Sequence, residues 1–220
     1  MLTLTRGEYV KMKRTKNQKI VAMVEMAMLT ALVVVLQIFG GMIKIPFLPF
    51  SFSLVLVPIV IGSIVLGYKN GTALGVVFGL VVVAQCATGI DVGGAILWNI
   101  SPVLTALICI VKGGAAGLVP GLIYRAMLSK KGGEELGARN LAASVVAAIS
   151  APVVNTGIFV IGLSAFFNDT LVSWAGGKDV MIYVITGLVG VNFLIELFLN
   201  VVLSPAISTI IKVTEKSLSK

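Results

Sequence analysis

A succession of long apolar runs, separated by short polar segments, constrains this chain more than any other feature. A helix that crosses a bilayer needs about 20 apolar residues, and the 220 residues of this chain can hold six such runs with short loops. Lipid requires every backbone polar group to be paired within the protein. The pattern therefore predicts an all-α, polytopic membrane protein with spans at about 20–40, 53–67, 72–88, 103–128, 140–165 and 180–211.

The composition agrees with a membrane protein and excludes a soluble enzyme. Hydrophobic residues make up 58% of the chain and charged residues only 12%, against about 25% charged residues in soluble domains. The sequence has no histidine, no zinc-protease or serine-hydrolase motif, and no glycine-rich phosphate loop. We therefore expect no enzymatic activity, no metal and no cofactor, and energy for uphill transport would come from an ion gradient or a partner protein.

The distribution of basic residues predicts the orientation in the membrane. If the N-terminus is cytoplasmic, the inner segments hold fourteen of the 17 lysine and arginine residues, whereas the outer loops hold only Lys44 and Lys178. Cytoplasmic segments are enriched in such residues. We therefore expect both termini in the cytoplasm of a multi-pass cell-membrane protein, with a basic segment at 1–19, a membrane domain at 20–212 and a tail at 213–220.

Polar residues at membrane depth are costly and by default mark functional positions. Residues 88–102 contain Asp91, two glycines, Trp98 and Asn99, and they are expected to form an outer loop able to dip into the membrane. Amides in the spans can either hydrogen-bond between helices or line an outward-facing pocket. The candidate substrate-binding residues are Gln37, Gln85, Asp91, Trp98, Asn99, Lys112, Asn155 and Asn192.

Lys112 lies about 13 Å inside its span, at a rise of 1.5 Å for each residue. That depth is too great for easy snorkelling, so its ammonium group needs an anion. The anion could be Glu196, an acidic residue of a loop, or a carboxylate of the substrate. A structural ion pair and a ligand contact both remain open from the sequence alone.

Small residues recur every four positions in three stretches, as they do where membrane helices pack closely. The two glycine stretches predict helix packing inside the bundle, and Cys86 and Cys109 are expected to be buried thiols. The Ala27 and Ala31 pair is open to either a packing or a docking role. The glycines are Gly67, Gly71, Gly75 and Gly79, followed by Gly113, Gly117 and Gly121.

The ordered set of these motifs resembles the substrate-binding S component of an energy-coupling factor (ECF) vitamin transporter. The resemblance covers nearly the whole chain, although no single motif is highly specific. Its residues are Ala27 and Ala31, Leu56 to Gly62, Gly71, Gly75 and Gly79, Asn99 to Pro102, Gly117 and Gly121, Tyr124 and Arg125, Asn155 to Gly157, and Asn192 with Glu196.

The resemblance implies a six-helix protein that binds a small vitamin near the extracellular face. It also implies delivery through a complex with one transmembrane coupling subunit and two ATPase subunits, with Ala27 and Ala31 docking on the coupling subunit. The pantothenate type is the most similar subtype, and riboflavin and folate remain possible substrates. Relatives of that subtype often carry Pro-Arg where this chain has Lys112 and Gly113, which shifts the cation by one position.

Two other functions are compatible with the sequence. A stand-alone secondary transporter of a small organic acid would need ligands for a coupling ion and usually a repeated half, and no convincing repeat relates the first three spans to the last three. A scaffold or a polytopic enzyme is the other alternative, and the missing catalytic residues argue against both.

Overall fold

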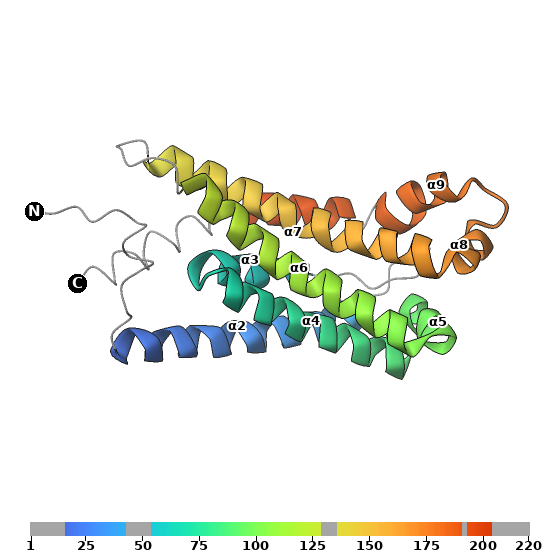
Figure 1. Cartoon of the computed structure of the whole chain (residues 1–220), viewed down its shortest axis with the longest axis horizontal. Helices are drawn as coiled ribbons and strands as arrows, with labels where there is room; N and C mark the ends of the chain where they lie inside the picture. Colours follow the sequence, from blue (N-terminus) through green and yellow to red (C-terminus); the bar gives the residue numbers. More distant parts are fainter. Residues whose placement is uncertain (1–15, 43–53, 129–135, 191–192, 204–220) are drawn as a thin grey trace, which may run out of the picture.

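The computed structural model describes residues 16–42, 54–128, 136–190 and 193–203, and this part of the chain is helical without strands (Figure 1). Residues 1–15, 43–53, 129–135, 191–192 and 204–220, which include most of the predicted basic N-terminal segment and all of the predicted C-terminal tail, lie outside the described residues. The helices are α2 (Lys16–Met42), α3 (Leu56–Val65), α4 (Tyr68–Thr88), α5 (Val92–Ile100), α6 (Pro102–Leu128), α7 (Leu136–Phe166), α8 (Asn168–Ala175), α9 (Val180–Tyr183), the π-helix η1 (Val184–Val189) and a last apolar helix, Phe193–Leu203.

Four of these helices are long and apolar enough to cross a membrane, namely α2, α4, α6 and α7. Two shorter apolar helices, α3 and Phe193–Leu203, fall within the other two predicted spans. The all-helical, multi-pass prediction is thereby confirmed. Each of the six apolar runs in the sequence contains an apolar helix, although the second and the sixth are shorter than expected.

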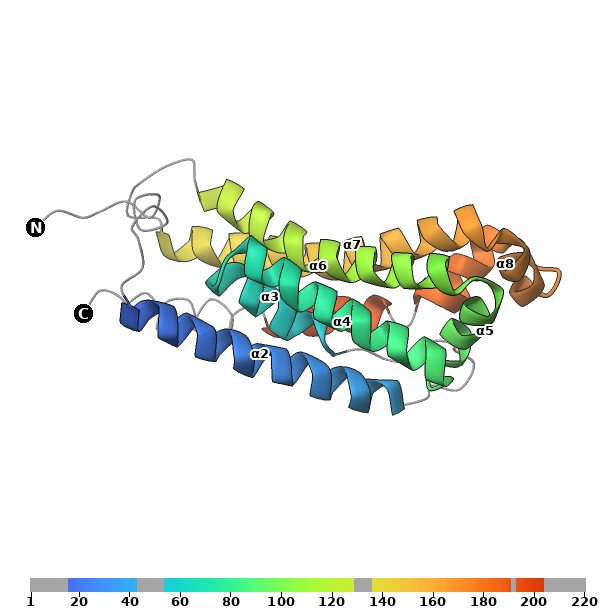
Figure 2. The same ribbon diagram turned by 60° about the horizontal axis from the view of Figure 1, so that its bottom comes forward.

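The four long helices run along the long axis of the molecule and form one bundle (Figures 1 and 2). The helices α2 and α4 begin at the end of the bundle where α6 finishes, which we call the basic end. The short helices α5 and α8 cap the opposite end, which we call the α5 end. Described charged residues near the basic end are Lys19, Lys69, Arg125 and Arg139, and those near the α5 end are Asp91, Asp169, Lys178 and Asp179.

The predicted glycine packing occurs between α4 and α6. A Cβ atom at Gly71 would lie 2.5 Å from the Gly117 carbonyl oxygen, and one at Gly79 would lie 2.6 Å from the Cys109 carbonyl oxygen. Between them, a Cβ at Gly75 would collide with the Gly113 carbonyl group. Only glycine lets the two backbones approach this closely, which is how helices associate where no water drives them together.

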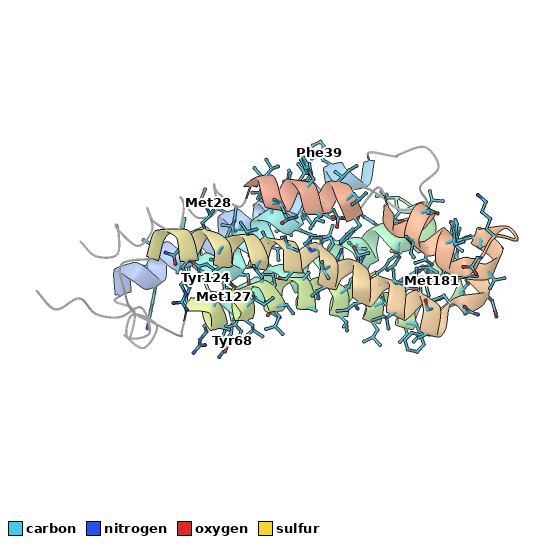
Figure 3. All side chains as sticks on the ribbon, turned by 90° about the horizontal axis from the view of Figure 1, so that it is seen from above. Met28, Phe39, Tyr68, Tyr124, Met127 and Met181 are labelled. Atoms are coloured by element: carbon cyan, nitrogen blue, oxygen red, sulfur yellow. The ribbon has the colours of Figure 1, made fainter. Side chains whose placement is uncertain are left out.

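Helix α2 lies at the side of the bundle and keeps much of its surface exposed (Figure 2). Its large exposed side chains include Met28 and Phe39, which lie at the margin of the molecule in Figure 3. Ala27 and Ala31 are also exposed. The opposite side of α2 buries Val33 and Gln37, so this helix is attached to the bundle along one narrow strip.

The prediction of a loop at 88–102 is wrong for most of its length, because residues 92–100 form the helix α5. Gly89 ends α4 with a positive φ of 79°, a conformation that favours glycine because it has no Cβ. Asp91 then caps α5, since its Oδ1 accepts a hydrogen bond from the Gly94 backbone N–H at 2.9 Å. A carboxylate at this position satisfies amides that would otherwise be unpaired at a helix start.

The sixth predicted span is also interrupted rather than continuous. Asp179 caps α9 by accepting a hydrogen bond from the Ile182 backbone N–H at 3.0 Å, and the chain then passes through the π-helix η1. Gly187 and Gly190 lie in and just after this segment, where glycine weakens an α-helix. Before this span, Trp174 lies in α8 and packs against the apolar cluster that contains Leu163.

Candidate functional site

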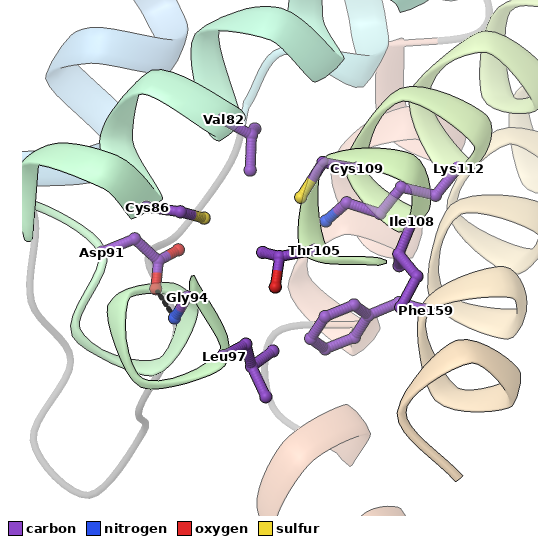
Figure 4. Close-up of a pocket in the computed structure, with 10 residues that line it drawn as sticks. All are labelled: Val82, Cys86, Asp91, Gly94, Leu97, Thr105, Ile108, Cys109, Lys112 and Phe159. Carbon is purple, nitrogen blue, oxygen red and sulfur yellow. Dashed lines mark hydrogen bonds between the residues drawn. The ribbon is translucent and has the colours of Figure 1, made fainter. Parts of the chain in front are cut away.

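A small cavity lies between α4, α5, α6 and α7, toward the α5 end of the bundle (Figure 4). Its volume is about 20 Å³, which is enough for little more than a water-sized molecule. Apolar and polar groups both face it, with the polar groups contributed by α6 and by the start of α5. The lining residues are Val82, Cys86, Asp91, Gly94, Leu97, Thr105, Ile108, Cys109, Lys112 and Phe159.

One face of α6 supplies the deepest polar groups of this cavity. Thr105, Cys109 and Lys112 are spaced by four and then three residues, which places them on the same side of a helix. The Thr105 hydroxyl donates to the Ser101 carbonyl oxygen at 2.8 Å, so its oxygen can still accept a hydrogen bond from a ligand. The same spacing could have identified Thr105 and Cys109 as neighbours of Lys112 from the sequence.

Lys112 presents its ammonium group to aromatic rings and to the cavity (Figure 4). Its Nζ lies 4.7 Å from the ring centroid of Phe159 and 5.9 Å from that of Phe78. Cation–π contacts of this kind stabilise a cation without neutralising it. The described contacts of the Lys112 ammonium group are thus with aromatic rings at the edge of the cavity.

The α5 side of the cavity is tightly packed. Asp91 is buried while it caps α5, and a Cβ atom at Gly94 would collide with the Cys86 sulfur. Glycine at position 94 therefore allows α5 to lie directly on α4. Leu97 and Trp98 anchor the same helix to two different apolar clusters, Leu97 to the cluster near α8 and Trp98 to the core around Phe78.

Several residues predicted to bind a ligand lie away from this cavity. Gln37 and Gln85 are both buried and hydrogen-bond to each other: Gln37 Nε2 donates to Gln85 Oε1 at 2.8 Å, and Gln85 Nε2 donates to the Gln37 carbonyl oxygen at 3.0 Å. The pair joins α2 to α4. Trp98 is half-buried against the core, and Asn99 is exposed at the surface.

The two remaining predicted residues lie on the C-terminal half of the chain. Asn155 is buried in α7, and its Oδ1 has no hydrogen-bond partner in the described part of the chain. Asn192 falls outside the described residues, whereas Glu196 and Asn200, which follow it at intervals of four, are both buried. Of the predicted ligand-binding residues, the structure thus brings Asp91 and Lys112 together at one cavity.

The described residues contain no group of three or more histidine, cysteine, aspartate or glutamate side chains that could hold a metal ion. Cys86 and Cys109 are buried free thiols, as expected, and both line the cavity. The chemistry available in the cavity is therefore one cation, one carboxylate, one hydroxyl and two thiols among apolar walls. This set suits the binding of a small polar molecule.

Comparison with known proteins identifies the family. The model of the ECF transporter substrate-specific component matches residues 21–208, which is most of the chain. The chain belongs to this family. This ECF substrate-specific component is also similar to the pantothenic acid transporter PanT of Lactococcus lactis subsp. cremoris (strain MG1363), with 26% identity over 206 residues that cover 89% of this chain and 94% of the relative.

Proposed function

We propose that this ECF substrate-specific component binds pantothenate in the cavity at the α5 end and delivers it through an ATP-driven complex. The complex would contain a transmembrane coupling subunit and two ATPase subunits, as in the family that the chain belongs to. The similarity to a pantothenic acid transporter along nearly the full length of both chains supports the substrate. The observation that carries the proposal is the position of Lys112, whose ammonium group lies over the Phe159 ring and lines the cavity.

The chemistry of pantothenate matches the groups that line the cavity. Pantothenate carries one carboxylate, one amide and two hydroxyl groups. Lys112 can bind the carboxylate through a charge-assisted hydrogen bond, which is stronger than a neutral one. The Thr105 hydroxyl and the Asp91 carboxylate can accept hydrogen bonds from the hydroxyl groups, while Phe159 and Leu97 contact the carbon chain.

The cavity must widen when it binds a vitamin. Sites for small molecules usually enclose about 300–1,000 Å³, far more than the cavity volume of about 20 Å³. Separation of α5 from α4 and α6 is the smallest movement that would open it, because α5 is a nine-residue helix at the end of the bundle. The proposal therefore includes an outward displacement of α5 on binding.

The proposed orientation places the α5 end outside the cell and both termini in the cytoplasm, with six membrane spans. The basic residues at the other end support this orientation, since cytoplasmic ends of spans are enriched in lysine and arginine. Ala27 and Ala31 would then lie in the cytoplasmic half of α2. Their exposure leaves a smooth strip on which a helix of the coupling subunit can pack.

Calorimetric titration of the purified protein in detergent tests the substrate. We expect saturable binding of pantothenate with one site for each chain, and no comparable heat with riboflavin or folate. Mass spectrometry of molecules that co-purify with the protein provides an independent identification. Saturable binding of riboflavin or folate instead of pantothenate would refute the substrate assignment while leaving the binding role intact.

Uptake by whole cells tests the energy source. Cells that express the protein together with its energising subunits should accumulate labelled pantothenate as long as ATP is available. Uptake that stops when the proton gradient is dissipated at constant ATP would instead indicate the stand-alone secondary transporter.

A further inference from the structure

The cavity contains a pair of thiols to which the proposed binding of pantothenate assigns no role. Cys86 on α4 is 2% exposed and Cys109 on α6 is 4% exposed, and both line the cavity. Their sulfur atoms point toward each other across it (Figure 4). The two thiols are close enough to interact directly.

We propose that Cys86 and Cys109 form a reversible disulfide that prevents the substrate from binding in the cavity. The proposal rests on the proposed function, because the same cavity is taken as the pantothenate site. The chain contains only these two cysteines, so any disulfide within one molecule must join this pair. Both are free thiols in the structure.

The packing around the two thiols favours their encounter. The glycine contacts of α4 with α6 hold the two helix backbones together, and the Gly79 contact lies at the Cys109 carbonyl group itself. Gly94 of α5 abuts the Cys86 sulfur and limits its movement away from the cavity. The two cysteines therefore belong to helices whose separation is fixed by backbone contact.

The reaction needs a small oxidant, and hydrogen peroxide meets the steric requirement. One thiolate attacks the peroxide, the O–O bond breaks, and a sulfenic acid and a hydroxide ion form; with the thiol proton the hydroxide becomes water. The second thiol then displaces the sulfenic oxygen as a second water, and the S–S bond forms. In total, two thiols lose two hydrogen atoms and the peroxide is reduced to two waters.

The location of the pair explains why such an oxidation would matter. In the proposed orientation the cavity lies toward the outside of the cell, where thiols are not held reduced as they are in the cytosol. Its small volume restricts entry to molecules slightly larger than water. A disulfide that spans the cavity from α4 to α6 would then obstruct the space that a displacement of α5 opens for a vitamin.

Peptide mapping of the full-length protein in detergent tests the bond itself without any variant. After brief exposure to hydrogen peroxide, we expect one linked peptide containing Cys86 and Cys109, a mass loss of two hydrogen atoms, and full reversal by dithiothreitol. Separate oxidation of the two cysteines, linkage between two chains, or intact thiols after exposure would each overturn the proposal.

Titration with pantothenate before and after exposure to peroxide tests whether the disulfide blocks binding. The affinity of the wild-type protein should fall at least tenfold and recover on reduction. The affinity of Cys86→Ala and that of Cys109→Ala are each measured before and after exposure to peroxide. Peroxide should change the affinity of either variant less than twofold. If the disulfide-linked protein binds pantothenate as tightly as the reduced protein, the proposal that the disulfide blocks binding is overturned. If the reduced protein does not bind pantothenate, the result counts against the proposed substrate and leaves the peptide-mapping result valid.

Discussion

The contact between α4 and α6 and the attachment of α2 show two opposite ways to place a helix in a membrane bundle. Of the apolar stretch in each helix, 44% of residues are buried in α4 and in α6 but only 11% in α2. The first contact is made backbone to backbone through glycines. The second depends on a narrow strip that includes Val33 and the hydrogen-bonded Gln37.

The difference indicates that the α4–α6 contact and the helix α2 have different roles in the bundle. Helices that touch through glycine cannot move apart without losing many small dispersion contacts, so α4 and α6 form a fixed frame for the cavity between them. A helix held along one strip keeps the rest of its surface available for another protein. The following predictions test this contrast, beginning with the change that should do the most damage.

Substitution of Gly75 by leucine should abolish the close contact between α4 and α6. A side chain at this position would collide with the Gly113 carbonyl group, and overpacking of this kind costs about 1–3 kcal/mol and occasionally more. We expect loss of monodisperse protein in size-exclusion chromatography. Gly157→Leu in α7 is the matched control, because a Cβ there meets no atom within 4 Å; equal damage from both changes would contradict the special role of the α4–α6 contact.

Substitution of Ala27 or Ala31 by tryptophan should abolish uptake while pantothenate binding stays intact. Both residues are exposed, so a large side chain fits in the isolated protein but prevents a partner helix from packing closely. The measurements are calorimetric affinity and uptake of labelled pantothenate by cells. Ala142→Trp, at an exposed position of α7, is the control and should leave both unchanged; parallel loss of binding and uptake in the Ala27 variant would refute the docking role.

Substitution of Lys112 by alanine should weaken pantothenate binding by about 1.5–3 kcal/mol, the value of a hydrogen bond to a charged group. That is a reduction of about 10- to 150-fold in affinity. Titration of pantothenate against the variant measures the effect. Pantothenol, which has an alcohol in place of the carboxylate, should bind the wild type and the variant with similar affinity; a similar loss for both ligands would indicate a general disturbance of the cavity.

Substitutions in the buried amide pair, Gln37 and Gln85, should have the smallest effect. Gln37→Leu leaves the buried Gln85 amide short of a partner and should destabilise the protein by about 1 kcal/mol, measured by thermal unfolding in detergent. The double substitution by leucine at both positions should cost less than the sum of the two single changes, because no buried amide is then left unpaired. Additive costs would mean that the two side chains act independently of each other.

The amino-acid sequence predicted the parts of this molecule that follow from hydropathy and residue size. The apolar runs indicated the helices, and the spacing of Gly71, Gly75 and Gly79 indicated a packing face that the structure confirms. Asp91 and Lys112 were both singled out by their rarity near membrane spans. Such signals are local, because each depends on a residue type and its spacing along one helix.

The sequence could not predict which polar residues share a cavity. Gln85 and Cys86 are adjacent in α4 and therefore point about 100° apart, so one bonds to α2 while the other faces α6. The sequence predicts a loop at 88–102, and glycine lowers the helix propensity of this stretch. The cap that Asp91 provides and the contacts of Leu97 and Trp98 with two apolar clusters outweigh this penalty.

The capping of α5 also bears on how an acidic cargo would enter. The start of a helix attracts anions, and without Asp91 the first amides of α5 would compete for the vitamin's acid group at the mouth of the cavity. Asp91 already occupies the Gly94 amide, and its own charge repels an incoming carboxylate. The cargo would therefore travel past the mouth with its acidic end leading, drawn toward Lys112, and its hydroxylated end would come to rest beside α5.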